Sequence, residues 1–299
     1  MRFRVGLLVA MALLGACSKT PVVGPKIDPF LVGLIPQDTT LLVGLRLDPL
    51  EKTDIYKKAL AKRPIPQVNA FAEKTGVDPS KDLWELLYVS NGKNGAFIGR
   101  GKFSDESEPR LGVRGDKRFN YKGMNLVGDE QTAILEVAPT VLAIGDTVEL
   151  RAMVDSHEKS SGPAPGMADL LKEISSSAQI WAAYNGGPLP MEFKGNLANI
   201  NTMVGLIQKG TFSLDFSAGM NGLAAGSSGS DADAEHLEGG LKALVGMGRL
   251  STPANNPELQ TAWDGLRPTR DGRDVKLHIE ERPELVDTLL GLLLGTPRR

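Results

Sequence analysis

The sequence predicts an α+β protein made of two similar domains, each an antiparallel sheet packed by helices. Segments in which apolar residues alternate with polar ones are interspersed with segments of helical periodicity. Reversals rich in glycine and asparagine separate neighbouring strand candidates, which is typical of antiparallel hairpins. The stretch Ser160-Ser161-Gly162-Pro163-Ala164-Pro165-Gly166 is the clearest break in composition. It predicts a linker over residues 159–166 between the two domains.

The first domain is expected over residues 31–158. An apolar run bounded by Asp38 and Asp48 predicts a buried strand over residues 41–45. Residues 91–95, Asn-Gly-Lys-Asn-Gly, predict a hairpin because asparagine and glycine tolerate positive φ. Asp146 is placed to cap a helix, with Glu149 completing a capping box. The other elements expected here are strands over 86–90, 96–103, 121–127, 132–137 and 141–144, and helices over 53–62, 66–76 and 147–157.

The second domain is expected over residues 167–295. Phe212, Leu214 and Phe216 alternate with polar residues, which predicts a half-buried strand over 211–217. Asp231 and Asp233 favour the start of a helix, because acidic side chains complement its dipole. The other elements expected are helices over 167–174, 196–208, 257–266 and 283–294, and strands over 179–184, 223–227 and 274–280. The two halves therefore show a comparable order of elements, which suggests a distant duplication.

Residues 1–16 have the pattern of a secretory signal peptide. Arg2 and Arg4 precede an apolar run over residues 5–14, and small residues follow it. The tetrapeptide Leu14-Gly15-Ala16-Cys17 resembles the lipobox of bacterial lipoproteins, whose cysteine is acylated and becomes the mature N-terminus. The resemblance implies lipidation of Cys17 and attachment to a lipid bilayer through its acyl chains. Residues 17–30 are polar and proline-bearing, and they would then form a lipidated tether.

Two further resemblances bear on location. Ser18 occupies the position at which an aspartate retains lipoproteins at the inner membrane of enterobacteria. The lipobox resemblance therefore implies the outer membrane, facing the periplasm, in a host that follows this rule. Pro36-Gln37-Asp38-Thr39, together with residues 75–83 and 99–103, resembles motifs of a loosely defined group of exported two-domain bacterial proteins. That resemblance implies a fold and a cell-envelope location, and it brings no activity.

Composition excludes several classes of function. The chain has 34 basic and 36 acidic residues and no long basic block, so nucleic acid is not an expected partner. Cys17 is the single cysteine, which excludes an internal disulfide, and its acylation would also exclude a cysteine nucleophile and a thiolate metal site. Beyond the signal peptide, no apolar segment reaches the roughly 18 residues that a membrane span needs.

The histidines and serines do not form a catalytic or metal-binding pattern. His157, His236 and His278 lack the i, i+4 spacing and the HExxH context of zinc ligands. Ser227 and Ser228 lie near a turn but miss the G-x-S-x-G spacing of a nucleophile elbow. An envelope hydrolase is therefore the least favoured alternative, and it would need one of the histidines beside this turn.

Two other motifs fail as cofactor sites. Asp231, Asp233 and Glu235 alternate as in a calcium loop, but His236 and Lys242 stand where an EF-hand needs glycine and glutamate. Helix capping explains the same acids. Residues 99–104 contain Gly-Lys but miss the spacing of a phosphate-binding P-loop. We therefore expect no cofactor and no metal.

The sequence favours a binding or structural role over an enzyme. The expected protein is a membrane-anchored envelope lipoprotein, with another envelope protein as a candidate partner. Apolar stripes over residues 237–248 and 285–294 are typical of core packing. The alternative is that they line a groove, which would make the protein a periplasmic carrier or chaperone for a hydrophobic ligand. This alternative requires an apolar cavity between sheet and helices.

Overall fold

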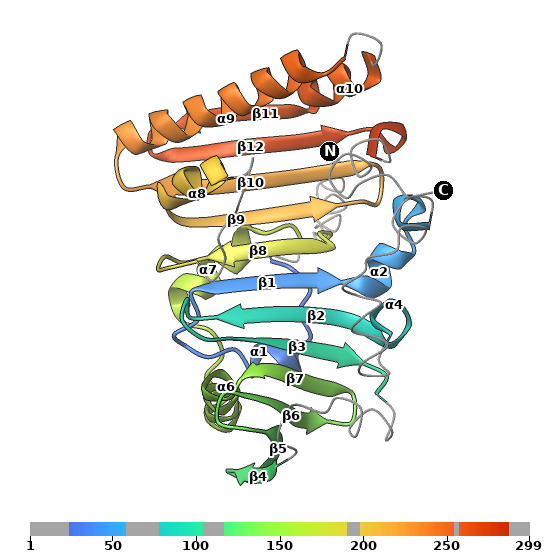
Figure 1. The fold of residues 1–299 in the computed structure, drawn as a ribbon, viewed down its shortest axis with the longest axis vertical. Coiled ribbons are helices and arrows are strands. Elements are labelled where there is room, and N and C mark those ends of the chain that lie inside the picture. Colours follow the sequence, from blue (N-terminus) through green and yellow to red (C-terminus); the bar gives the residue numbers. More distant parts are fainter. Residues whose placement is uncertain (1–23, 58–77, 104–116, 190–197, 254–256, 287–299) are drawn as a thin grey trace, which may run out of the picture.

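The strands pair into a single antiparallel sheet (Figure 1). The computed structural model describes residues 24–57, 78–103, 117–189, 198–253 and 257–286. Within these residues the sheet has 12 strands in the order β11-β12-β10-β9-β8-β1-β2-β3-β7-β6-β5-β4. The strands are β1 (Leu41–Arg46), β2 (Leu83–Ser90), β3 (Gly95–Gly101), β4 (Lys117–Tyr121), β5 (Met124–Gly128), β6 (Thr132–Ala138), β7 (Val141–Asp146), β8 (Ile180–Tyr184), β9 (Ile207–Asp215), β10 (Met220–Ser228), β11 (Leu266–Asp271) and β12 (Asp274–Glu281).

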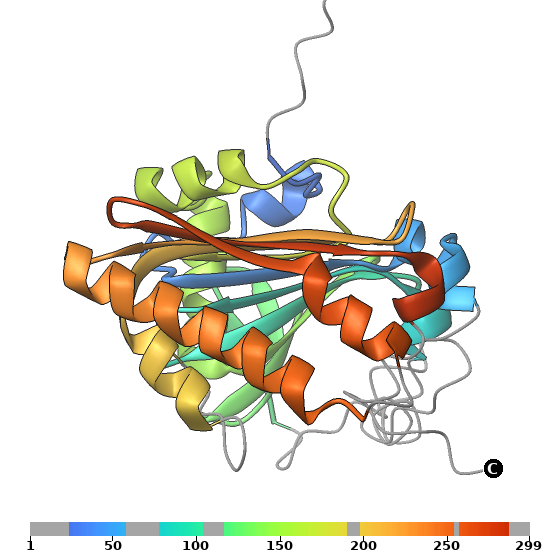
Figure 2. The same cartoon turned by 90° about the horizontal axis from the view of Figure 1, so that it is seen from above.

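Helices lie on both faces of this sheet (Figure 2), which confirms the α+β class. One face carries α1, α6 and α7, and the opposite face carries α8, α9 and α10. Two short helices, α2 and α4, lie at one end of the strands. The helices are α1 (Pro29–Val32), α2 (Leu47–Glu51), α4 (Pro79–Asp82), α6 (Thr147–Lys159), α7 (Pro165–Glu173), α8 (Ala198–Gly205), α9 (Asp231–Ser251) and α10 (Pro257–Ala262).

The two halves of the chain meet between β1 and β8. These strands pair antiparallel from Leu41↔Tyr184 to Leu45↔Ile180, so strands from both predicted domains form one continuous sheet. The predicted linker, 159–166, contains the connection between α6 and α7. The division into two domains stays a prediction, because the sheet itself shows no break at this boundary.

The strand order is the same in both halves when it is read outward from the β1–β8 contact. It is β1-β2-β3-β7-β6 on one side and β8-β9-β10-β12-β11 on the other. Equivalent positions in the two halves can be found by tracing the strand pairings outward from the β1–β8 contact. Leu83 of the first half is then equivalent to Ile207 of the second, and Gly101 is equivalent to Ser228. The pairing register shifts at the equivalent point in each half. Just past the shift, Leu83 pairs with Gly101 in the first half and Ile207 pairs with Ser228 in the second. A shared bulge of this kind supports the duplication suggested by the order of elements.

The main core lies between the sheet and the face that carries α1, α6 and α7. Trp181 is its largest fully buried side chain, and Leu42, Leu87 and Ile98 from neighbouring strands are equally buried. Trp181 lies opposite Gly44 across the β1–β8 contact. A Cβ at residue 44 would lie 2.1 Å from the indole ring, so only glycine fits there. The tryptophan therefore fills the space that the missing side chain leaves.

Most predicted elements are confirmed. The hairpin over residues 91–95 joins β2 and β3. The Asn91 side-chain oxygen accepts hydrogen bonds from the backbone N–H groups of Lys93 and Asn94, at 3.0 and 2.9 Å. Ser230 caps α9 by accepting from the Asp233 N–H at 3.1 Å, so helix capping does explain the acids at that position. The helix predicted over 66–76 lies outside the described residues.

Three predictions about strands and helices were wrong. Residues 121–127 do not form one strand, because Lys122 and Gly123 both adopt positive φ and turn the chain between β4 and β5. The helix predicted over 196–208 ends as α8 at Gly205, and Gln208 belongs to β9. The helix predicted over 257–266 ends earlier, and β11 follows it. Its sequence, Leu-Arg-Pro-Thr-Arg-Asp, has the charges and proline of a protected edge strand and lacks apolar alternation.

The predicted capping box at α6 was also wrong, because its hydrogen bond does not form. The helix begins at Thr147 as expected, but the Asp146 side chain makes no capping hydrogen bond. Its carboxylate instead accepts from the Gly95 N–H at 2.7 Å. The reason is that β7 pairs with β3, which brings the start of β3 next to Asp146.

The contact between Gly44 and Trp181 can be tested by substitution. We expect Gly44→Ala to lower the free energy of unfolding by about 3 kcal/mol, because the new methyl group would overlap the buried ring. Urea denaturation of the purified chain measures this. Gly239→Ala is the matched control: nothing lies within 4 Å of that Cβ position in α9, so alanine should stabilise the helix by about 0.5–1 kcal/mol. Equal effects of the two variants would contradict the packing described.

Candidate binding sites

An apolar cavity of about 310 Å³ lies between the second half of the sheet and helices α8 and α9. Its walls are almost entirely aliphatic or aromatic. On the sheet side they include Ala182, Phe212, Ala224, Gly226, Val275 and Leu277, and on the helix side Met203, Val204, Leu237, Leu241 and Leu244. A cavity of this composition suits an apolar ligand.

Small residues in the middle of the sheet create this cavity. Pairing places Ala182 opposite Phe212, Phe212 opposite Ala224, and Ala224 opposite Leu277, so one cross-strand row alternates small and large side chains. Gly210 and Gly226 form the neighbouring row and carry no side chain. Glycine and alanine on the sheet therefore leave space that the leucines of α9 do not fill. Two glycines of α9 lie against large side chains, Gly248 against Trp263 and Gly240 against Met203.

An exposed apolar stripe on α9 continues from the rim of the cavity. Leu244 lines the cavity and is 38% exposed, while Met247 and Leu250 are 60% and 88% exposed. These three residues follow each other at a spacing of three, so they lie along one side of the helix. Contiguous exposed apolar surface is typical of interaction sites, so this stripe is a candidate contact surface.

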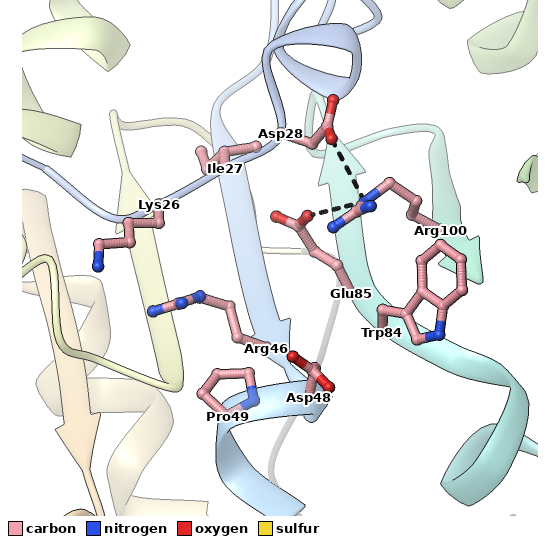
Figure 3. A pocket seen from close by; sticks show the side chains of 9 residues that line it. All are labelled: Lys26, Ile27, Asp28, Arg46, Asp48, Pro49, Trp84, Glu85 and Arg100. Carbon is pink, nitrogen blue, oxygen red and sulfur yellow. Dashed lines mark ion pairs between the residues drawn. The ribbon is translucent and has the colours of Figure 1, made fainter.

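A second pocket, of about 250 Å³, is polar and lies on the opposite face of the sheet (Figure 3). Three strands supply a row of charges to it. Arg46 of β1 pairs with Glu85 of β2, and Glu85 pairs with Arg100 of β3. Cross-strand partners point to the same face, so the row places a carboxylate between two guanidinium groups. The N-terminal segment, with Lys26 and Asp28, covers this row.

Ion pairs hold one side of the polar pocket together. The Arg100 Nε lies 3.5 Å from a carboxylate oxygen of Asp28 and 3.5 Å from one of Glu85. The guanidinium group also lies over the Trp84 ring, 5.3 Å from its centroid. The second Asp28 oxygen accepts from the Phe30 N–H at 2.9 Å, which caps α1. Asp28 thus fixes the N-terminal segment to the sheet.

Burial shapes the chemistry of Glu85. Its side chain is almost inaccessible, and burial raises the pKa of the carboxyl group, while the Arg100 charge acts in the opposite direction. One carboxylate oxygen, Oε1, has no hydrogen-bond partner among the described residues. The sequence reasoning did not identify Glu85 or Arg46. The 91–95 hairpin could have revealed the Glu85–Arg100 pair, because its register aligns the two residues.

The residues examined as catalytic candidates do not come together. Ser227 pairs with Asp274 of β12, whereas His278 pairs with Leu223, four residues along the strand. Ser228 is buried, and its hydroxyl has no hydrogen-bond partner among the described residues. His236 is exposed on α9, and the His157 ring packs at a tilt against the Phe30 ring, with a centroid distance of 5.2 Å. Cys17, the predicted lipidation site, lies outside the described residues.

Two other buried carboxyl groups lie away from both pockets. Burial, followed by the nearby charges of Asp38 and Asp146, raises the pKa of Glu149 to about 7. Burial likewise raises the pKa of Glu281 to about 7. Among the described residues, no group of three or more His, Cys, Asp or Glu side chains could hold a metal ion. No helix in the described ranges is long and apolar enough to cross a bilayer.

Comparison with known proteins gives a likeness of fold alone. No protein-family model matches the chain, and no curated protein matches it. The structure is similar to crystal form I of TP0453, with a TM-score of 0.46 and 10% sequence identity over 90% of this chain and 98% of that one. Crystal form III of TP0453 aligns with a TM-score of 0.47 and 9% identity over 88% of this chain and 98% of that one. A likeness of this degree carries no argument about function.

Removal of the Arg100 charge tests the polar pocket. We expect Arg100→Met to lower the free energy of unfolding by about 3 kcal/mol near pH 8, because the buried Glu85 carboxylate loses its counter-charge. The loss should be smaller near pH 5. The pKa of Glu85 is already raised in the folded protein and rises further without Arg100. The folded variant therefore keeps this carboxyl group protonated to a higher pH than the unfolded chain does, and its free energy of unfolding falls as the pH increases. Urea denaturation at both pH values measures the difference.

Two further variants serve as controls. The double variant Glu85→Leu/Arg100→Met should recover most of the lost stability, since the buried carboxylate that lacks a counter-charge is removed as well. Arg249→Met breaks an exposed ion pair with Asp264 and should change the free energy of unfolding by no more than about 0.5 kcal/mol. A loss in Arg100→Met that does not depend on pH would argue against the role assigned to Glu85.

Proposed function

We propose that this protein is a lipid-anchored protein of the bacterial cell envelope that binds a hydrophobic ligand between its sheet and helix α9. The observation that carries the proposal is the apolar cavity of about 310 Å³. A helix that packs tightly on a sheet leaves few spaces larger than a water molecule, so an apolar space of this size that opens to the surface has the character of a binding groove. An apolar ligand that enters this space removes both its own surface and the apolar walls from water, which favours binding.

The surface next to the cavity supports the same proposal. Leu244 belongs both to the cavity lining and to the exposed stripe that continues through Met247 and Leu250. A hydrophobic ligand can therefore remain in contact with apolar side chains while it moves from the surface to the interior. The proposal makes the protein a carrier or chaperone and gives the exposed stripe a role in ligand transfer.

Anchoring by Cys17 is the second part of the proposal. It is supported by the signal-peptide pattern of residues 1–16 and by the resemblance of residues 14–17 to a lipobox. Acyl chains on Cys17 would hold the cavity near a membrane, which is where hydrophobic ligands are available. The outer membrane, facing the periplasm, is the location that Ser18 favours.

Filling the cavity should weaken ligand binding. We expect Ala224→Phe to weaken the binding of cis-parinaric acid by at least about tenfold, because the ring would occupy the space beside Phe212 and Leu277. Fluorescence titration of the purified full chain measures the dissociation constant. Ala243→Phe is the matched control, since residue 243 is exposed on α9 outside the cavity lining. Equal binding by Ala224→Phe, folded by circular dichroism, would overturn the proposed ligand site.

A separate experiment addresses the anchor. We expect Cys17→Ser to move the protein from the membrane fraction to the soluble fraction of a bacterial host, because the acylated atom is removed. Metabolic labelling with an alkyne fatty acid should mark the wild-type chain and leave the variant unmarked. Membrane association that persists unchanged in the variant would rule out anchoring by this residue.

A further inference from the structure

The polar pocket contains two cationic groups that no carboxylate of the described residues neutralises. The Lys26 ammonium group has neither a hydrogen bond nor an ion pair within the described chain. Arg46 uses a single nitrogen, Nη1, which donates to the backbone oxygens of Ser176 and Ala178 at 3.3 and 3.4 Å. Its remaining N–H groups have no partner among the described residues. Both side chains line the pocket, on the side away from Arg100 (Figure 3).

The carboxylates of the pocket already have partners. Asp28 and Glu85 share Arg100, and Asp48 pairs with the exposed Lys52 at 2.9 Å. Lys26 and Arg46 are therefore the groups that an incoming anion would meet. Arginine binds a phosphate or carboxylate through paired N–H donors, and lysine adds a compact positive charge.

The same carboxylates limit what kind of anion can bind. A multiply charged anion would be repelled by Asp28, Asp48 and Glu85, which all line the pocket. A ligand with one negative charge and a linked positive charge avoids this repulsion. Asp48 lines the same pocket, and because its side chain is 61% exposed it can exchange Lys52 for the positive group of a ligand. The lining therefore favours a small zwitterion.

The position of the pocket in the chain indicates where such a zwitterion comes from. Lys26 follows Cys17 by roughly nine residues, which span at most about 30 Å when extended. If Cys17 is acylated, as proposed above, the pocket remains this close to the lipid headgroups. With a volume of about 250 Å³ and charged walls, it can accept a headgroup but not an acyl chain.

We propose that the polar pocket binds the phosphoethanolamine headgroup of a membrane phospholipid. Lys26 and Arg46 hold the phosphodiester, and Asp48 receives the ammonium group. Arg100 and Glu85 keep the N-terminal segment in place over the site through Asp28. The inference that the ligand comes from a membrane rests on the proposed anchor at Cys17. The inference that the pocket binds a zwitterion rests on its lining residues alone. The site is separate from the apolar cavity on the other face of the sheet.

Binding is best measured on the full chain carrying Cys17→Ser, which removes the anchor and retains the pocket. The probes are glycerophosphoethanolamine and inorganic phosphate, each titrated by calorimetry. We expect glycerophosphoethanolamine to bind at least about tenfold more tightly than phosphate. Lys26→Gln and Arg46→Gln should each weaken its binding by about tenfold, the usual effect of losing one charge-assisted hydrogen bond. Lys26 is exposed, so its variant should fold even if Arg46→Gln does not.

Lys242→Gln is the control, because Lys242 is an exposed residue of α9 that lines neither pocket. Its affinity for glycerophosphoethanolamine should equal that of the parent chain. Affinity that is unchanged in Lys26→Gln, or equal for phosphate and glycerophosphoethanolamine, would overturn the proposed site. Parinaric acid binding by the Lys26→Gln chain should be unaffected, so failure of this proposal is distinguishable from failure of the apolar cavity.

A flotation assay distinguishes a membrane source from a soluble one. The Cys17→Ser chain is mixed with vesicles of phosphatidylcholine or of equimolar phosphatidylcholine and phosphatidylethanolamine. We expect it to float only with the second kind, and glycerophosphoethanolamine should release it. Binding of glycerophosphoethanolamine without flotation would show that the pocket serves a soluble phosphate ester, and it would overturn the assignment to a membrane lipid.

Discussion

The packing of Trp181 on Gly44 connects the two halves of the protein. β1 and β8 form the only direct strand pairing between the halves in the described chain, and the tryptophan fills the space beside the glycine at that pairing. Because Trp181 is fully buried in the main core, the strand pairing and the packing of α7 depend on the same residue. The strand orders and the bulges match on either side of this pairing, as the predicted duplication requires. One continuous sheet results, and each of its faces is covered separately.

The two faces differ in how well they are filled. Leu42, Leu87, Ile98 and Trp181 fill the face under α1, α6 and α7 with large side chains. On the opposite face, Ala182, Gly210, Ala224 and Gly226 leave the middle of the second half hollow. The missing volume lowers the stability that α9 could contribute, since unfilled apolar space loses both burial and van der Waals contact. This loss is the physical argument that the space serves a ligand.

The polar pocket couples the N-terminal segment to the sheet. Asp28 caps α1 with one oxygen and pairs with Arg100 through the other, so the end of the predicted tether is fixed at a charged row of three strands. Leu31, Leu34 and Ile35, which follow directly, are fully buried in the main core. The end of the predicted tether is therefore only a few residues from side chains that are packed in the main core. The pocket also places Lys26 and Arg46, which have no carboxylate partner among the described residues, beside the contact between Asp28 and Arg100 (Figure 3).

The sequence by itself determined the local elements whose signals are local. The hairpin over 91–95, the alternation of Phe212 and Leu214, and the acids that open α9 depend on neighbouring residues alone, and all are confirmed. The tertiary structure decided what depends on partners distant in sequence. The sequence around Arg267 and Arg270 does not indicate a strand, and these residues form one because they pair with β12. Asp146 accepts a hydrogen bond from Gly95 and does not cap α6, because β7 pairs with β3. The cavity also required the tertiary structure, because an alanine leaves a hollow only where the facing helix does not fill it.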